Sequence, residues 1–115
     1  MDKDLSVRVK VTIRKNNAFF GPGIAQLIRL IDELGSVKEA CQSMGLSYSK
    51  GWFIINRAET ELGYQLIRRN HGGRDGGGAS LTDEGHLFLD KFDRLEKRIA
   101  DYAVTAFDDI YGRED

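Results

Sequence analysis

Three helix-length segments lie between residues 22 and 63, and a glycine-containing break follows each of them. Pro22 suits the first turn of a helix, where its missing N–H costs nothing, and Gly35 suits the left-handed residue after the last turn. Ser36 can cap the next helix, and Glu39 three residues later completes a capping box. These signals predict two consecutive helices with a sharp break between them.

A tight turn, Met44-Gly45-Leu46, joins the second segment to the third, which begins after Ser47 and ends before Gly63. Two strand-like segments, 66–69 and 79–81, follow on either side of a glycine-rich run. Two helices joined by a tight turn and followed by a hairpin have the layout of a winged helix-turn-helix. The predicted fold class is therefore mainly α with a small β part.

One stripe of the third predicted helix carries small and apolar side chains: Gly51, Ile55, Ala58 and Leu62. Ile55, Ala58 and Leu62 lie within about 40° of Gly51 at 100° per residue, so we expect this stripe to face the core. Glycine in the stripe allows a neighbouring helix to approach closely. Cys41, on the inward side of the second predicted helix, is expected to be a small core residue.

Residues 5–14 alternate apolar and polar side chains. This period of two predicts a half-buried N-terminal strand whose outer face is basic, with Arg8, Lys10 and Arg14 on it. Residues 15–17 are expected to form the loop that follows.

Thr82 can cap a long last helix that runs to about Tyr111. Apolar residues in it recur at alternating steps of four and three, the spacing of a coiled-coil seam. We interpret 82–115 as a dimerisation helix and 1–81 as the winged helix-turn-helix domain; the alternative is that the helix only packs back on its own domain. The predicted homodimer seam comprises Phe88, Phe92, Leu95, Ile99, Tyr102 and Ala106.

Charge is distributed unevenly along the 115 residues, although the formal net charge is only −1. Segments 1–35 and 36–81 each carry more basic than acidic residues, whereas 82–115 carries twice as many acidic as basic ones. Such asymmetry is expected when one end of a protein meets a polyanion such as double-stranded DNA.

A single cysteine rules out a disulfide framework within the chain, and one Cys with two His cannot supply a four-ligand zinc site. We expect no metal and no cofactor. The polar N-terminus lacks the apolar core of an export signal, and no apolar run is long enough to span a membrane. The expected location is the cytoplasm, with no membrane partner.

The outward face of the third predicted helix offers short polar groups and one exposed aromatic ring, flanked by cations. Asn56 can bond an adenine edge, and Phe53 can contact a thymine methyl. Cations on the flank and hydroxyls at the helix N-terminus can reach phosphates. The candidate DNA-binding residues on this helix are Ser47, Tyr48, Ser49, Lys50, Trp52, Phe53, Asn56 and Arg57.

The glycine-rich hairpin adds Arg69, His71 and Arg74 to these candidates, because glycines let a backbone approach DNA and arginine suits a narrow minor groove. A plain surface loop is the alternative. A nucleotide-binding loop is disfavoured, because neither the P-loop nor the dinucleotide-binding glycine pattern is present. Nothing indicates a catalytic grouping, so we expect no enzyme. A protein-interaction module that uses the same helix face is the second hypothesis.

These motifs together resemble the DNA-binding domain of the molybdate-responsive regulator family ModE and, more distantly, the LysR-type regulators. The matching residues are Gly21-Pro22-Gly23, Gly35-Ser36-Val37, Leu46-Ser47-Tyr48 with Trp52, Gly72-Gly73, Gly76-Gly77-Gly78-Ala79, Leu81-Thr82 and Gly85. The resemblance implies a dimeric, sequence-specific transcription regulator.

Members of that family also carry C-terminal molybdate-binding modules, and no residues up to Asp115 match such a module. The family's effector therefore cannot be carried over. The expectation is either a stand-alone DNA-binding protein or one for which a separate partner senses an effector.

Overall fold

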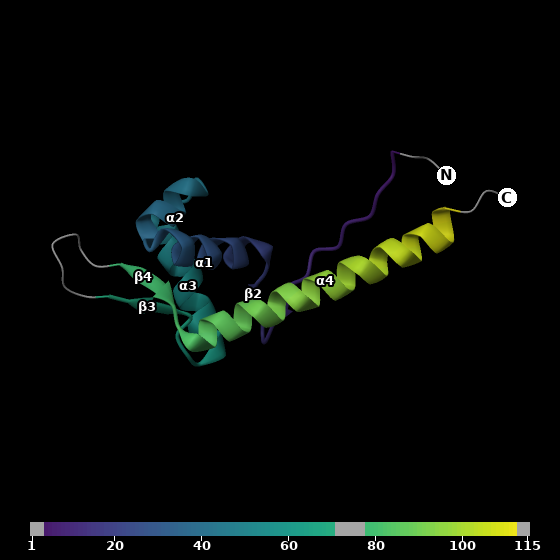
Figure 1. Cartoon of the computed structure of the whole chain (residues 1–115). Helices are drawn as coiled ribbons and strands as arrows, with labels where there is room; N and C mark the ends of the chain where they lie inside the picture. Colours follow the sequence, from purple (N-terminus) through teal and green to yellow (C-terminus); the bar gives the residue numbers. More distant parts are fainter. Residues whose placement is uncertain (1–3, 71–77, 113–115) are drawn as a thin grey trace.

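The computed structural model describes residues 4–70 and 78–112. Helices cluster at one end, two short antiparallel strand pairs flank them, and the last helix extends far beyond (Figure 1). The predicted class, mainly α with a small β part, is confirmed. In chain order the elements are β1 (Ile13–Arg14), β2 (Ala18–Phe20), α1 (Pro22–Leu34), α2 (Val37–Ser43), α3 (Tyr48–Leu62), β3 (Ile67–Arg69), β4 (Ala79–Leu81) and α4 (Asp83–Tyr111).

The helix boundaries follow the capping residues that the sequence predicts. The Ser36 side chain accepts a hydrogen bond from the Glu39 N–H at 3.1 Å, and the Ser47 side chain caps α3 in the same way. Thr82 caps α4 through the Gly85 N–H at 2.9 Å. Each cap satisfies an N–H that the first helical turn leaves without a partner.

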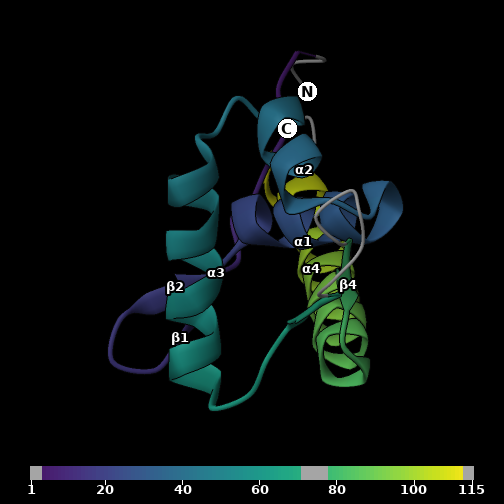
Figure 2. The same ribbon diagram turned by 90° about the vertical axis from the view of Figure 1, so that its left-hand side faces the viewer.

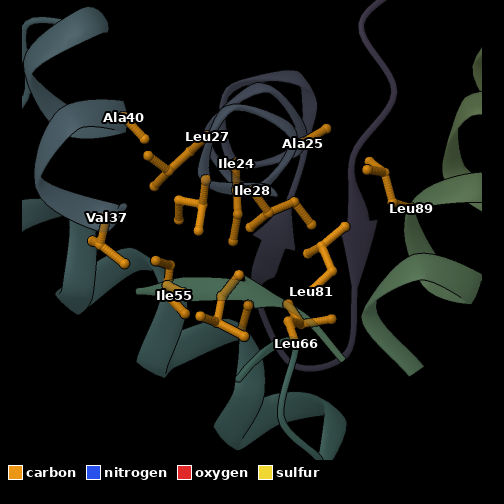
Figure 3. Close-up of a cluster of buried hydrophobic side chains, with 14 of the residues drawn as sticks. Ile24, Ala25, Leu27, Ile28, Val37, Ala40, Ile55, Leu66, Leu81 and Leu89 are labelled. Carbon is orange, nitrogen blue, oxygen red and sulfur yellow. The ribbon is translucent and has the colours of Figure 1, made fainter. Parts of the chain in front are cut away.

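The hydrophobic core lies between α1, α2, α3 and the two strands β3 and β4 (Figure 3). Leu27, Ile28 and Ile31 of α1 have no solvent-exposed surface, and neither do Ile55 of α3 and Leu66 before β3. Helix α1 is therefore the central element, and α3 and the strands pack on it with one face each.

Gly51 lies where α3 crosses α2, against the side chain of Cys41. A Cβ atom at position 51 would collide with the Cys41 sulfur, which confirms the expected close approach of the two helices. Burial raises the pKa of the Cys41 thiol, so this residue is a neutral core side chain.

Gly51→Ala should lower the free energy of unfolding by about 1–3 kcal/mol, because overpacking outweighs the gain in helix propensity. Removing the sulfur should relieve the collision, so Cys41→Ala should cost less in the Gly51→Ala background than in the wild type. Urea unfolding of the two single variants and the double variant measures this coupling. Strictly additive effects would contradict the contact.

The predicted N-terminal strand over residues 5–14 is wrong in extent. Only Ile13 and Arg14 pair with another strand, namely β2. Residues 5–12 are extended, and none of them pairs with a strand in the described part of the chain. Alternation correctly marks Val7, Val11 and Ile13 as half-buried, whereas Leu5 and Val9 of the same apolar set are exposed. It does not specify a neighbouring strand, and a strand requires one.

The first turns of α4 belong to the core of the same subunit. Phe92 is only 1% exposed, and its ring lies edge-on to that of Phe20, with 4.9 Å between the centroids. Phe88 makes the same kind of contact at 4.7 Å and is half-buried. The burial of Phe92 does not favour its expected place in the dimer seam, because its ring is already packed against Phe20 of β2. Phe88 shares this aromatic cluster, which leaves it little surface for a partner.

None of the described helices combines the length and apolar character needed to cross a membrane.

Candidate nucleic-acid interface

The outward face of α3 is exposed as the sequence predicts. Ser49, Phe53 and Asn56 are all exposed, and the Phe53 side chain retains 64% of its accessible surface. A large aromatic ring exposed to this extent on the face away from the core contributes little to the packing of the subunit. The face is thus available to a partner.

Arg69, at the end of β3, reaches across to this face of α3. Its guanidinium carbon lies 3.8 Å from the centre of the Trp52 ring, and its Nη2 donates to the Asn56 Oδ1 at 3.4 Å. Stacking on an indole ring stabilises the cation and fixes its position. The 3.4 Å bond is long, so the Asn56 amide still has hydrogen-bonding capacity for another group. The sequence places Arg69 and Asn56 on separate elements, and the structure joins them.

The base of the hairpin is tied to α3 through Glu59, a residue that the sequence did not single out. Its Oε2 accepts hydrogen bonds from the backbone N–H groups of Leu66 at 2.8 Å and Ile67 at 3.1 Å. The signal in the sequence was a carboxylate about 80° from Gly51 at 100° per residue, next to the core stripe of the helix. Glu59 therefore holds β3, and with it Arg69, at a fixed place beside α3.

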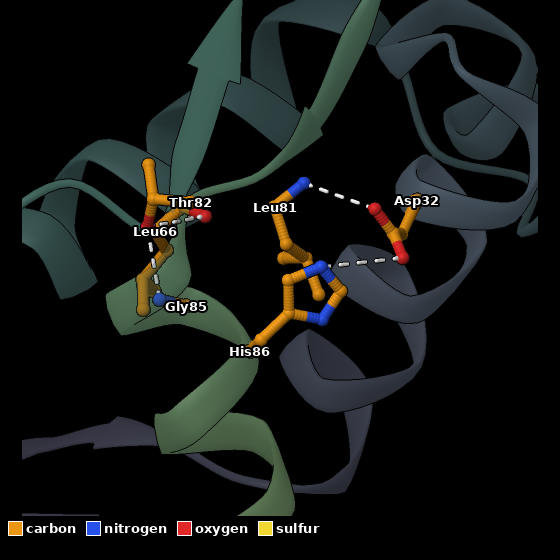
Figure 4. A network of polar contacts seen from close by, with 6 residues as sticks. All are labelled: Asp32, Leu66, Leu81, Thr82, Gly85 and His86. Carbon is orange, nitrogen blue, oxygen red and sulfur yellow. Dashed lines mark hydrogen bonds and ion pairs between the residues drawn. The ribbon is translucent and has the colours of Figure 1, made fainter.

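A second polar network anchors β4 to α1 and α4 (Figure 4). Asp32 of α1 accepts from the Leu81 N–H at 3.1 Å, and its other oxygen lies 3.8 Å from His86 Nε2. The Thr82 hydroxyl donates to the Gln65 carbonyl at 2.7 Å. The two strands pair in register, Ile67 with Leu81, so both sides of the hairpin are held by side chains of the helical core.

The remaining α3 candidates surround the exposed face. Lys50 and Arg57 are exposed on the flank away from Arg69, and neither forms an ion pair within the described part of the chain. Tyr48 is 56% exposed, and its ring lies edge-on to that of Trp52 at 6.4 Å. The Ser47 oxygen caps the helix, which leaves its hydroxyl hydrogen available as a donor.

Two hairpin candidates, His71 and Arg74, lie outside the described residues. In the described part of the chain, no three His, Cys, Asp or Glu side chains gather as a metal ion would require.

The C-terminal part of α4 presents apolar side chains to solvent. Leu95 is 40% exposed, Ile99 38% and Tyr102 76%, and Ala106 is half-buried. All four belong to the predicted seam and lie beyond Phe92, where the helix has left the core (Figure 1). The predicted seam therefore has two parts: Phe88 and Phe92 pack in the core, whereas the part from Leu95 onward is mostly exposed.

Comparison with known families places this geometry in context. Residues 25–86, which comprise α1 to β4 and the start of α4, match the family described as "Bacterial regulatory helix-turn-helix protein, lysR family". The chain belongs to this family. The matched region contains α3, β3, Glu59 and Asp32, so the candidate interface lies within the part of the chain that matches the family.

Curated relatives include the transcriptional regulator ModE of Haemophilus influenzae, 29% identical over 93 residues, which are 80% of this chain and 36% of that protein. The DNA-binding transcriptional dual regulator ModE of Escherichia coli is 28% identical over 79% of this chain and 35% of its own length. The chain thus spans about a third of the length of these relatives. The resemblance to ModE seen in the motifs is confirmed.

Solved structures share the fold. The CbnR_DBD–DNA complex superposes with a TM-score of 0.56 at 24% identity, covering 73% of this chain and 94% of that one. The BenM_DBD/catB site 1 DNA complex superposes with a TM-score of 0.57 at 22% identity, covering 81% of this chain and 97% of that one. At this identity the likeness establishes the winged helix-turn-helix architecture.

Proposed function

We propose that this protein is a sequence-specific DNA-binding regulator of transcription that inserts α3 into the major groove. The observation that carries the proposal is the exposed face of Ser49, Phe53 and Asn56, with Arg69 held beside it by Trp52. A helix of this kind fits the major groove of B-DNA, and its polar groups match base edges.

Each side chain has a role that its chemistry allows. The Asn56 amide bonds an adenine edge, and the Phe53 ring contacts a thymine methyl. Lys50 and Arg57 bind phosphates on one flank, while Tyr48 and the hydroxyls of Ser47 and Ser49 bind near the N-terminus of α3. Arg69 extends the interface toward the hairpin, whose tip residues His71 and Arg74 we expect to contact the adjacent backbone or minor groove.

We also propose that the protein acts as a homodimer through α4. Leu95, Ile99, Tyr102 and Ala106 form a revised seam, and a second copy of the helix is the partner with matching spacing. Residues 1–81 then serve as the DNA-binding domain and 82–115 as the dimerisation helix, although the first turns of α4 also complete the core. Twofold symmetry of such a dimer requires an inverted-repeat target.

The names of the relatives favour this proposal over a protein-interaction module and over an enzyme. ModE of Escherichia coli is a DNA-binding transcriptional dual regulator, and the family comprises regulatory proteins. A regulator of this type works on DNA in the cytoplasm. We assign it no effector and no cofactor, because the matched part of the relatives is about a third of their length.

Selection of bound duplexes from a random pool tests the function, followed by a titration of the selected duplex over salt concentration. We expect an inverted repeat to be enriched, and the logarithm of the binding constant to fall linearly with the logarithm of salt concentration. If no duplex is retained, or if binding does not depend on salt concentration, the proposal of sequence-specific DNA binding is refuted.

A further inference from the structure

A groove of about 260 Å³ lies beside the proposed interface, on the side of α3 that faces the N-terminal hairpin, which β1 and β2 form. One wall is the extended segment with β2, another is the start of α1, and the third is α3. The lining includes Lys10, Thr12, Phe19, Pro22, Phe53 and Arg57. Residues far apart in the sequence thus meet at one surface feature, of which the proposed function uses only Phe53 and Arg57.

The groove is positively charged. Lys10 and Arg57 are both exposed, and no carboxylate lines the groove with them. Within residues 4–70 and 78–112, neither cation forms an ion pair. Arg14 of the same hairpin is also exposed. Two uncompensated cations beside apolar rings match a sugar–phosphate backbone, which presents an anion and an apolar sugar in alternation.

The position of the groove is continuous with the proposed interface. Phe53 and Arg57 belong to both surfaces. In Figure 1, β2 lies on one side of α3 and β3 and β4 lie on the other, and β2, which lies behind α3 in Figure 2, packs directly against it. DNA that lies along α3 therefore has the wing, the hairpin of β3 and β4, on one flank and the N-terminal hairpin on the opposite flank.

We propose that this groove binds the DNA backbone, with Lys10 and Arg57 on a phosphate at the edge of the major groove that α3 enters. The inference rests on the proposed function and adds a second flanking contact opposite the wing. Lys10 lies outside residues 25–86, the part of the chain that matches the lysR family. The extended segment before β1 would thus enlarge the DNA contact beyond that matched part.

Lys10→Gln is the informative variant, because Lys10 contacts only the groove, whereas Arg57 also borders the base-reading face. We expect a roughly 3–10-fold loss of affinity for the selected duplex and for random duplex alike, and a salt slope smaller by about 1. Asn56→Ala serves as the contrast, since it should reduce discrimination at one base pair. Lys97→Gln, an exposed lysine on α4 paired with Asp101, should bind like the wild type.

Ethylation interference locates the contact. Ethylation of one phosphate at the edge of each half-site should weaken DNA binding by the wild type. It should not weaken DNA binding by Lys10→Gln any further. If the wild type binds DNA with the expected salt dependence but Lys10→Gln matches it in affinity and slope, the groove proposal fails and the proposed function stands. A loss of affinity with an unchanged slope would also overturn it. Binding of inorganic phosphate to the wild type, with DNA affinity unaffected by Lys10→Gln, would assign the groove to a free anion instead.

Discussion

Phe92→Ala should lower the free energy of unfolding by about 3–5 kcal/mol, the usual cost of removing a fully buried ring. The ring is 1% exposed and packs edge-on against Phe20, so its loss leaves a cavity where α4 meets β2. Edge-to-face aromatic pairs also contribute beyond the area they bury. The variant is expected to unfold at much lower urea concentration than the wild type.

Leu95→Ala is the matched control for this prediction. Leu95 lies three residues further along α4 and is 40% exposed in the subunit, so its truncation should cost the isolated subunit much less. Measurements at several protein concentrations separate the two effects, because truncation at a dimer interface lowers stability only at concentrations at which the dimer forms. If Phe92→Ala left stability unchanged and instead dissociated a dimer, the original seam assignment would have been right.

Ile99→Glu should convert the dimer to a folded monomer and lower the affinity for an inverted-repeat duplex by at least about 100-fold. The charge would enter the centre of the exposed seam, where a second helix must exclude water. Folding should be preserved, because Ile99 is 38% exposed and lies beyond the core contacts of α4. Sedimentation equilibrium measures the mass, and a mobility-shift titration measures the affinity.

Val104→Glu makes the same chemical change on the opposite side of the helix. Val104 is 51% exposed and is about 140° from Ile99 at 100° per residue, so this variant should stay dimeric and bind DNA normally. Should both variants dimerise like the wild type, the seam would not be the interface. If Val104→Glu alone dissociated the dimer, the opposite face of α4 would be the contact.

Local signals in the sequence predicted the helices well. Ser36, Ser47 and Thr82 cap the helices through bonds to residues three positions away, and such bonds depend only on neighbouring residues. The contact of Gly51 with α2 was also predictable, because glycine within an apolar stripe has few other uses in a helix.

Contacts between distant segments could not be predicted in this way. Periodicity marks Phe92 and Ile99 as equally apolar positions on one stripe, but it does not say whether the same subunit or another one covers them. The bond from Arg69 to Asn56 and the Glu59 anchor join elements whose relative placement only the folded chain defines. The candidate interface was thus predicted residue by residue on α3, whereas the way the wing is held beside it was not.

Helix α4 begins inside the core and continues as a single rod of 29 residues, about 43 Å long at 1.5 Å per residue. Its N-terminal part, with the buried residues Gly85, Leu89 and Phe92, packs on the domain that contains α3. A rotation of the rod by only 5° would displace its far end by about 4 Å, on the scale of one base-pair step. In a dimer that binds DNA, a small change in the crossing angle of the two α4 helices would therefore change the distance between the two α3 helices. That distance determines which spacings between half-sites the dimer can bind.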